Sequence, residues 1–164
     1  MSMKIEPYIL EKWVWSDEDF DLMGWHDVTI HAVGVALEQW ELFLDIDYIL
    51  QWIDPIPPEE YFKFWVAPAS LVYENVSDLK IDIDVGSYQE ITLQGIERSN
   101  PRVSNGVITV WDWLLESHQG SVSFIATGFK QYIRSAPMLG KMQSLEINQR
   151  GGFSFSRDVP TQDI

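Results

Sequence analysis

Apolar and polar residues alternate along most of the chain. Between positions 40 and 48 every even-numbered residue is apolar or aromatic, and three of the four odd-numbered residues are acidic. Successive side chains of a strand point to opposite faces, so this alternation predicts a strand with one buried face. Similar patterns predict further strands at residues 27–37, 62–66, 70–76, 79–85, 91–96, 107–115 and 121–133.

We therefore expect a mainly β protein of eight to ten antiparallel strands, arranged as a single sheet, a sandwich or a partly open barrel. The chain contains no internal repeat and no long linker, so residues 1–164 are expected to form a single β-rich domain. At the end of the chain, residues 145–149 and 153–156 are expected to pair as a hairpin around Gly151 and Gly152.

One short helix is expected near the N-terminus. Ser16 is a favourable cap, acidic residues follow at positions 17–19, and Gly24 is suited to end the helix. The strand after it changes phase, because apolar residues occupy even positions from 28 to 32 and odd positions from 33 to 37. This change predicts a β-bulge at Gly34.

Several polar residues of the first two predicted strands are candidates for a functional site. If they form a hairpin that turns near Glu38, Asp27 lies opposite Asp47, Thr29 opposite Asp45 and His31 opposite Phe43. One face would then carry a polar patch of four residues, Asp27, His31, Asp45 and Asp47. Such a patch offers oxygen ligands for a hard cation, or a histidine oriented by a carboxylate for proton transfer.

The structural interpretation of these residues is favoured over the catalytic one. A histidine on a strand is more often a hydrogen-bonded or exposed structural residue, and His26 should point away from His31. His26 and Asp27 are expected at a corner where polar side chains satisfy free backbone groups, with Trp25 anchored in the core. The sequence has two Asp-x-Asp pairs, Asp45 with Asp47 and Asp82 with Asp84, and neither matches a calcium-binding loop.

Aromatic content is high, with 8 Trp, 8 Phe and 6 Tyr. Phe43, Trp65 and Trp111 lie outside the core-facing set and are candidates for an interaction surface. The alternative, which we favour, is that an apolar N-terminal segment covers the second face of the sheet. The residues of that segment that need burial are Tyr8, Ile9, Leu10, Trp13 and Trp15.

The formal net charge is −14, and it is unevenly distributed. Residues 1–98 carry a net −15 and residues 99–164 a net +1. The acidic part should repel phosphate backbones and anionic lipids, so neither nucleic acid nor a membrane is an expected partner. A basic protein partner, a divalent cation or simple solubility remain compatible with this charge.

Other chemistry has little support in the sequence. The absence of cysteine excludes disulfides and thiolate metal sites. There is no phosphate-binding or dinucleotide-binding glycine motif, so no cofactor is expected. With no signal peptide or long apolar stretch, a cytoplasmic location is expected.

Four segments carry a resemblance to other proteins: GWHD at 24–27, LDIDYI at 44–49, WVAPA at 65–69 and ENV at 74–76. Together they resemble a family of uncharacterised small bacterial β-rich proteins, and the WHD segment is also similar to immunity-type β proteins of bacterial toxin systems. Neither resemblance implies an activity. The favoured hypothesis is a non-catalytic cytoplasmic interaction or accessory protein with an acidic surface. The alternative is a small hydrolase-like or cation-binding enzyme that uses the polar patch. The oligomeric state is not predicted.

Overall fold

The computed structural model describes residues 5–87 and 89–160. Over these residues the chain forms ten strands of one antiparallel open sheet, which confirms the mainly β prediction. Their order is β1-β9-β4-β3-β2-β6-β7-β8-β5, with β10 paired to β4. The strands are β1 (Val14–Ser16), β2 (Thr29–Ala36), β3 (Glu41–Ile53), β4 (Lys63–Glu74), β5 (Ser77–Ile83), β6 (Ile91–Ser104), β7 (Ile108–Ser117), β8 (Gly120–Ala126), β9 (Gly128–Ile133) and β10 (Met138–Gly140).

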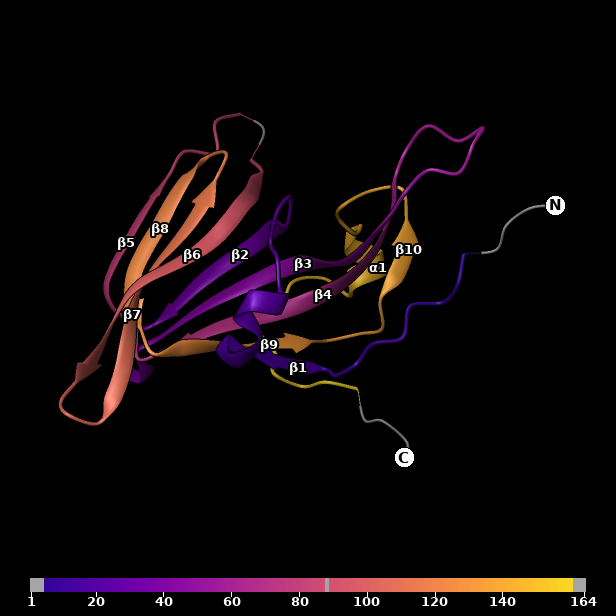
Figure 1. The fold of residues 1–164 in the computed structure, drawn as a ribbon. Coiled ribbons are helices and arrows are strands. Elements are labelled where there is room, and N and C mark those ends of the chain that lie inside the picture. Colours follow the sequence, from indigo (N-terminus) through magenta and orange to yellow (C-terminus); the bar gives the residue numbers. More distant parts are fainter. Residues whose placement is uncertain (1–4, 88, 161–164) are drawn as a thin grey trace.

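The sheet curls so that its two halves face each other. Figure 1 shows β5 to β8 on one side of the molecule and β3, β4 and β9 on the other. Aromatic rings fill the space between them: Tyr73 of β4 lies 5.0 Å from Trp113 of β7 and 4.6 Å from Phe124 of β8, between ring centroids. The core therefore lies inside the curl, on what we call the inner face of β3 and β4.

The expected N-terminal helix is present, but as the 3-10 helix η1 (Asp17–Leu22). Ser16 caps it as predicted, because its Oγ accepts from the Glu18 N–H and its own N–H donates to Asp19. A second 3-10 turn, η2 (Leu37–Gln39), joins β2 to β3. In the described residues the one α-helix, α1 (Ile147–Arg150), is a single turn near the C-terminus.

The predicted C-terminal hairpin is wrong. Residues 147–150 are helical, and residues 153–160 follow without joining the sheet. Glu146 and Gln149 form a capping box at the start of the turn, and Gly151 and Gly152, both with positive φ, end it. The glycines form a helix C-terminus here rather than a hairpin turn.

The register predicted for β2 and β3 is also wrong. Thr29 pairs with Asp47 and Ala32 with Asp45, and the bulge lies between Ile30 and Ala32 rather than at Gly34. The predicted change of phase is present, because His31 is an extra residue in β2. The side chains after it therefore point to the opposite face from the one that the earlier alternation predicts. The turn at η2 sets a pairing that the hydrophobic pattern alone does not fix.

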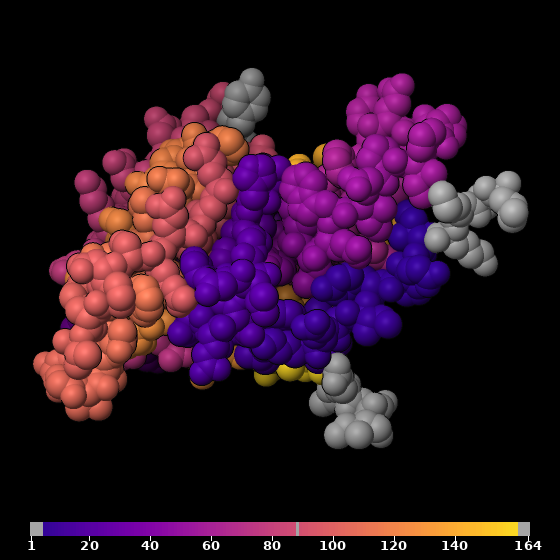
Figure 2. Space-filling model, in the orientation of Figure 1, coloured from indigo at the N-terminus to yellow at the C-terminus, as the bar shows by residue number. Residues whose placement is uncertain are grey.

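The middle of β3 is buried on both faces, since residues 44–49 are all buried. Leu44, Ile46 and Tyr48 belong to the hydrophobic core, whereas Asp45 and Asp47 point to the outer face. The C-terminal segment, which we define as residues 141–160, covers that outer face through contacts described below. Figure 2 shows the N-terminal residues across the front of the molecule, whereas the C-terminal segment is visible only at its margins.

Within residues 5–87 and 89–160, none of the helices has the length and apolar character needed to span a membrane.

Candidate functional site

Two aspartates of β3 form the centre of a buried polar cluster on the outer face. Asp45 and Asp47 are completely buried. They point to the same side because they are two residues apart on a strand. Three more side chains complete the cluster: His31 from the bulge of β2, Arg134 from the residue after β9, and Arg150 from α1.

Both carboxylate oxygens of Asp45 accept hydrogen bonds. Arg150 donates from Nη2 to Oδ1 at 2.6 Å and from Nη1 to Oδ2 at 3.0 Å, which is a bidentate contact. Arg134 donates to Oδ1 at 2.7 Å, and the backbone N–H of Ser154 donates to Oδ2 at 3.0 Å. The other Nη of Arg134 donates to the Ser70 hydroxyl at 2.9 Å.

Asp47 is paired just as fully. The Arg150 Nε donates to Oδ1 at 3.0 Å. On Oδ2, the Leu145 N–H donates at 2.8 Å and the His31 Nε2 lies 2.6 Å away. A single guanidinium therefore bridges the two aspartates, and Arg150 also donates to the Gly152 carbonyl.

The electrostatics favour the charged forms of Asp45 and Arg150. Burial alone raises the pKa of Asp45, but the hydrogen bonds from Arg150, Arg134 and Ser154 outweigh it and hold the pKa below its ordinary value. Burial lowers the pKa of Arg150, yet its contacts with Asp45 and Asp47 raise that pKa overall. The cluster is thus a set of buried ion pairs with nearly every donor and acceptor used.

This arrangement is suited to attaching the C-terminal segment rather than to binding a substrate. All four carboxylate oxygens of Asp45 and Asp47 are occupied by groups of the same chain. In the part of the chain that the structure describes, no group of three or more His, Cys, Asp or Glu residues is arranged to hold a metal ion. The carboxylates are neutralised by guanidinium groups, which leaves no charge for a cation to balance.

Of the four residues in the predicted polar patch, three come together. His31, Asp45 and Asp47 belong to the buried cluster, whereas Asp27 lies outside it, at a corner with φ of 65°. Asp27 accepts from the side chain of Gln143 at 2.9 Å, and His26 Nδ1 lies 3.2 Å from the same oxygen. The contact to Gln143 makes Asp27 another attachment point of the C-terminal segment.

Trp25 anchors this corner as predicted. Its side chain is 3% exposed, and its indole N–H donates to Gln131 at 2.9 Å.

The three aromatic candidates are all half-buried under other parts of the chain. Phe43 packs on Phe155 of the C-terminal segment, with 5.7 Å between ring centroids. Tyr8 lies 6.4 Å from the ring of Trp65, and the Arg98 guanidinium lies 4.3 Å above Trp111. The N-terminal segment therefore reaches Trp65, whereas the cover of Phe43 comes from the opposite end of the chain.

Several residues of the predicted N-terminal cover do pack on the core, although one does not. Leu10, Trp13 and Trp15 contact the hydrophobic core, whereas Ile9 is 85% exposed.

Arg134 and Arg150 were not predicted as members of the polar cluster. One signal in the sequence pointed to them: the excess of acid before residue 99 and the slight excess of base after it. Arg157 follows the same rule, because it pairs with Glu41, which shares the outer face of β3 with the aspartates. Part of the positive charge that balances the acidic strands therefore comes from the same chain.

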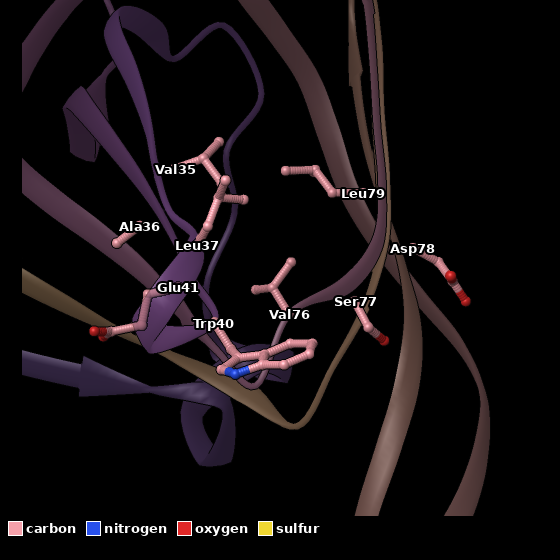
Figure 3. Close-up of a pocket in the computed structure, with 9 residues that line it drawn as sticks. All are labelled: Val35, Ala36, Leu37, Trp40, Glu41, Val76, Ser77, Asp78 and Leu79. Atoms are coloured by element: carbon pink, nitrogen blue, oxygen red, sulfur yellow. The ribbon is translucent and has the colours of Figure 1, made fainter.

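A second candidate site is an apolar groove of about 440 Å³ between η2 and the start of β5. Figure 3 shows the side chains of Val35, Leu37, Val76 and Leu79 directed into the same space, with the Trp40 indole along one side. The sequence pattern does not indicate this groove, because Trp40 continues the alternation of β3 and is therefore expected to face the core. In the structure its side chain is 62% exposed.

Comparisons with protein-family models, with curated proteins and with solved structures gave no match.

Proposed function

We propose that this chain is a non-catalytic binding protein of the cytoplasm whose acidic surface recognises a basic partner protein. The observation that carries the proposal is the complete use of Asp45 and Asp47 within the chain. The buried polar cluster, which is the candidate catalytic group, therefore serves to hold the fold together. An enzyme using these carboxylates would first have to break buried ion pairs, which is strongly unfavourable.

The surface charge supports the second half of the proposal. Arg134, Arg150 and Arg157 are engaged with acidic groups of β3, so they do not offset the acidic surface elsewhere. Exposed acidic residues remain around the molecule, and complementary charge speeds and orients association with a basic protein. Members of this exposed acidic set include Glu18, Asp21, Glu38, Asp54, Asp78, Asp82 and Asp84.

The test is binding of a labelled basic peptide to the full chain. A fluorescein-labelled twelve-residue peptide rich in Lys and Arg should raise its anisotropy in a saturable manner with one peptide per chain. Its affinity should fall as sodium chloride is increased, because screening weakens contacts between exposed charges. A matched peptide with Glu at the basic positions should not bind. Failure of the basic peptide to bind at low salt would overturn the proposal.

The competing enzyme hypothesis makes a different prediction. If the polar patch held a catalytic cation, the melting temperature would rise with cation concentration, since a ligand of the native state stabilises it. We expect the melting temperature to be the same with and without millimolar magnesium, calcium, manganese or zinc. A rise that saturates with one of these metals, and disappears in Asp47→Asn, would favour the enzyme instead.

A further inference from the structure

We propose that the apolar groove between η2 and β5 receives a large apolar side chain from a basic segment of the partner protein. This inference rests on the proposed function and names the site at which it would operate. The groove is lined by Val35, Ala36, Leu37, Trp40, Val76 and Leu79, with polar groups of Glu41, Ser77 and Asp78 at its margin.

Several apolar residues of the groove are exposed. Leu37 is 80% exposed, Trp40 62% and Val35 40%. These three lie within six positions of one another and line one cavity, so they form a contiguous patch rather than scattered apolar residues. Contiguous apolar patches with a polar margin are typical of contact surfaces, and tryptophan is enriched among the residues that contribute most to binding.

The backbone of Trp40 is held in an uncommon conformation. This residue has φ of 57°, in the left-handed region that bulky side chains rarely adopt. Two hydrogen bonds hold it there: its N–H donates to the Leu37 carbonyl at 3.3 Å, and its carbonyl accepts from Val76 at 2.7 Å. Such a conformation is unfavourable for a bulky residue and is concentrated at functional sites. Here it positions an indole that lies mostly outside the core.

The charges beside the groove indicate the chemistry of its occupant. Glu38 on η2 and Asp78 and Asp82 on β5 are exposed and form no ion pair within the described residues, while Lys80 is the single base on these two elements. Figure 3 shows the Asp78 carboxylate directed away from the apolar lining, toward the outside of the groove. An apolar side chain flanked by Lys or Arg therefore matches both the lining and its margin.

Two other acidic residues near the groove are already paired. Glu41 pairs with Arg157 and Glu74 with Lys130. The acids without an ion pair within the described residues therefore lie on η2 and β5: Asp78 lines the groove, and Glu38 and Asp82 belong to the same two elements. A basic segment crossing the groove would place charges next to both elements while its apolar side chain fills the cavity.

The experiment uses two basic peptides of equal charge against the full chain. One carries a central Trp flanked by lysines, and the other carries Ser in place of that Trp. The proposal predicts that the Trp peptide binds at least tenfold more tightly to the wild-type protein, by fluorescence anisotropy. Leu37→Ser and Trp40→Asn should remove most of this difference. Val107→Ser should not, since Val107 is 85% exposed but lies in the hairpin between β6 and β7.

Trp40→Asn also separates binding from folding. Asparagine tolerates the left-handed backbone conformation better than tryptophan does, so the melting temperature should stay the same or rise while binding weakens. Equal binding of the Trp peptide to wild type and Trp40→Asn would overturn the groove assignment but leave the basic-partner proposal standing. No binding of either peptide to wild type would overturn both. Self-association of the wild type that Leu37→Ser abolishes would assign the groove to a second copy of the chain instead.

Discussion

Arg150 holds together the two aspartates of the buried polar cluster. Its guanidinium bridges Asp45 and Asp47, and all three side chains are completely buried. We expect Arg150→Met to destabilise the protein by about 3–5 kcal/mol, because it leaves two buried carboxylates without their main counter-ion. The measurement is guanidinium chloride unfolding followed by tryptophan fluorescence.

The matched control for that substitution is Arg102→Met. Arg102 also pairs with an aspartate, Asp112, at 3.0 Å, but both side chains are substantially exposed. Exposed ion pairs contribute about 0–1 kcal/mol, so this variant should lose little stability. Equal losses in the two variants would contradict the view that burial makes the Arg150 contacts important.

Gly34 gives a second residue-scale prediction. A Cβ at this position would lie 3.0 Å from Cε2 of Phe155, whereas a Cβ at Gly95 on β6 would meet nothing within 4 Å. Alanine is favoured over glycine inside a strand by roughly 0.5–1 kcal/mol. Gly95→Ala should therefore gain stability, and Gly34→Ala should be less stable than Gly95→Ala by about 1 kcal/mol, because Phe155 must shift. Denaturant titration of both variants decides this, and indistinguishable midpoints would mean that Phe155 moves freely.

At the scale of elements, the strands with one polar face could be predicted from the sequence, whereas the position of the C-terminal segment could not. The alternation around Asp45 and Asp47 is a local signal, so it identifies β3 directly. The position of α1 depends on contacts between Arg150 and residues more than 100 positions earlier, which no local pattern contains. The buried polar cluster was only partly predictable for the same reason. Asp45, Asp47 and His31 lie on neighbouring strands and could be grouped from the sequence, whereas their arginine partners are distant in the chain and could not.

Attachment of the C-terminal segment can be followed by limited proteolysis with trypsin. The bond after Arg150 is protected because its side chain is buried, and we expect Asp45→Asn to speed cleavage there by weakening the contacts of Arg134, Arg150 and Ser154. Mass spectrometry identifies the site, and circular dichroism should show the sheet retained. Asp112→Asn, which alters an exposed pair, should leave the cleavage rate unchanged. Equally slow cleavage of Asp45→Asn would show that the cluster does not hold this segment.

At the scale of the whole molecule, the uneven charge of the chain has a partly internal explanation. The acidic strands come first, and arginines near the end return to pair with them: Arg134 and Arg150 with Asp45, and Arg157 with Glu41. The pairs of Arg150 and Arg157 fasten the C-terminal segment over the outer face of the sheet. The charge that remains on the surface is then strongly negative, and it is this charge that the proposed basic partner would complement.

The same pairing predicts how stability depends on acid. The pKa of Asp45 is held below its ordinary value by Arg150, Arg134 and Ser154 against the effect of burial, and the pKa of Asp19 is lowered by its hydrogen bonds from Lys12 and Ser16. Below about pH 4, the ordinary range for an aspartate, the unfolded chain therefore binds more protons than the folded one. Above that pH these groups should make their full contribution to the free energy of unfolding. That contribution should decrease as the pH falls through their folded-state pKa values.

Urea titrations between pH 2 and pH 6 measure this dependence, and Asp45→Asn provides the comparison. The variant lacks the titrating group, so its unfolding free energy, although lower near neutral pH, should change less steeply between pH 4 and pH 2 than that of the wild type. Because the C-terminal segment depends on the same carboxylate, acid should also expose the bond after Arg150 before the sheet unfolds. An acid-stable protease that cleaves within residues 141–160 at pH 3, while circular dichroism still reports strands, would demonstrate that order of events. Parallel pH profiles for the two proteins would instead assign the acid sensitivity to carboxylates outside the buried cluster.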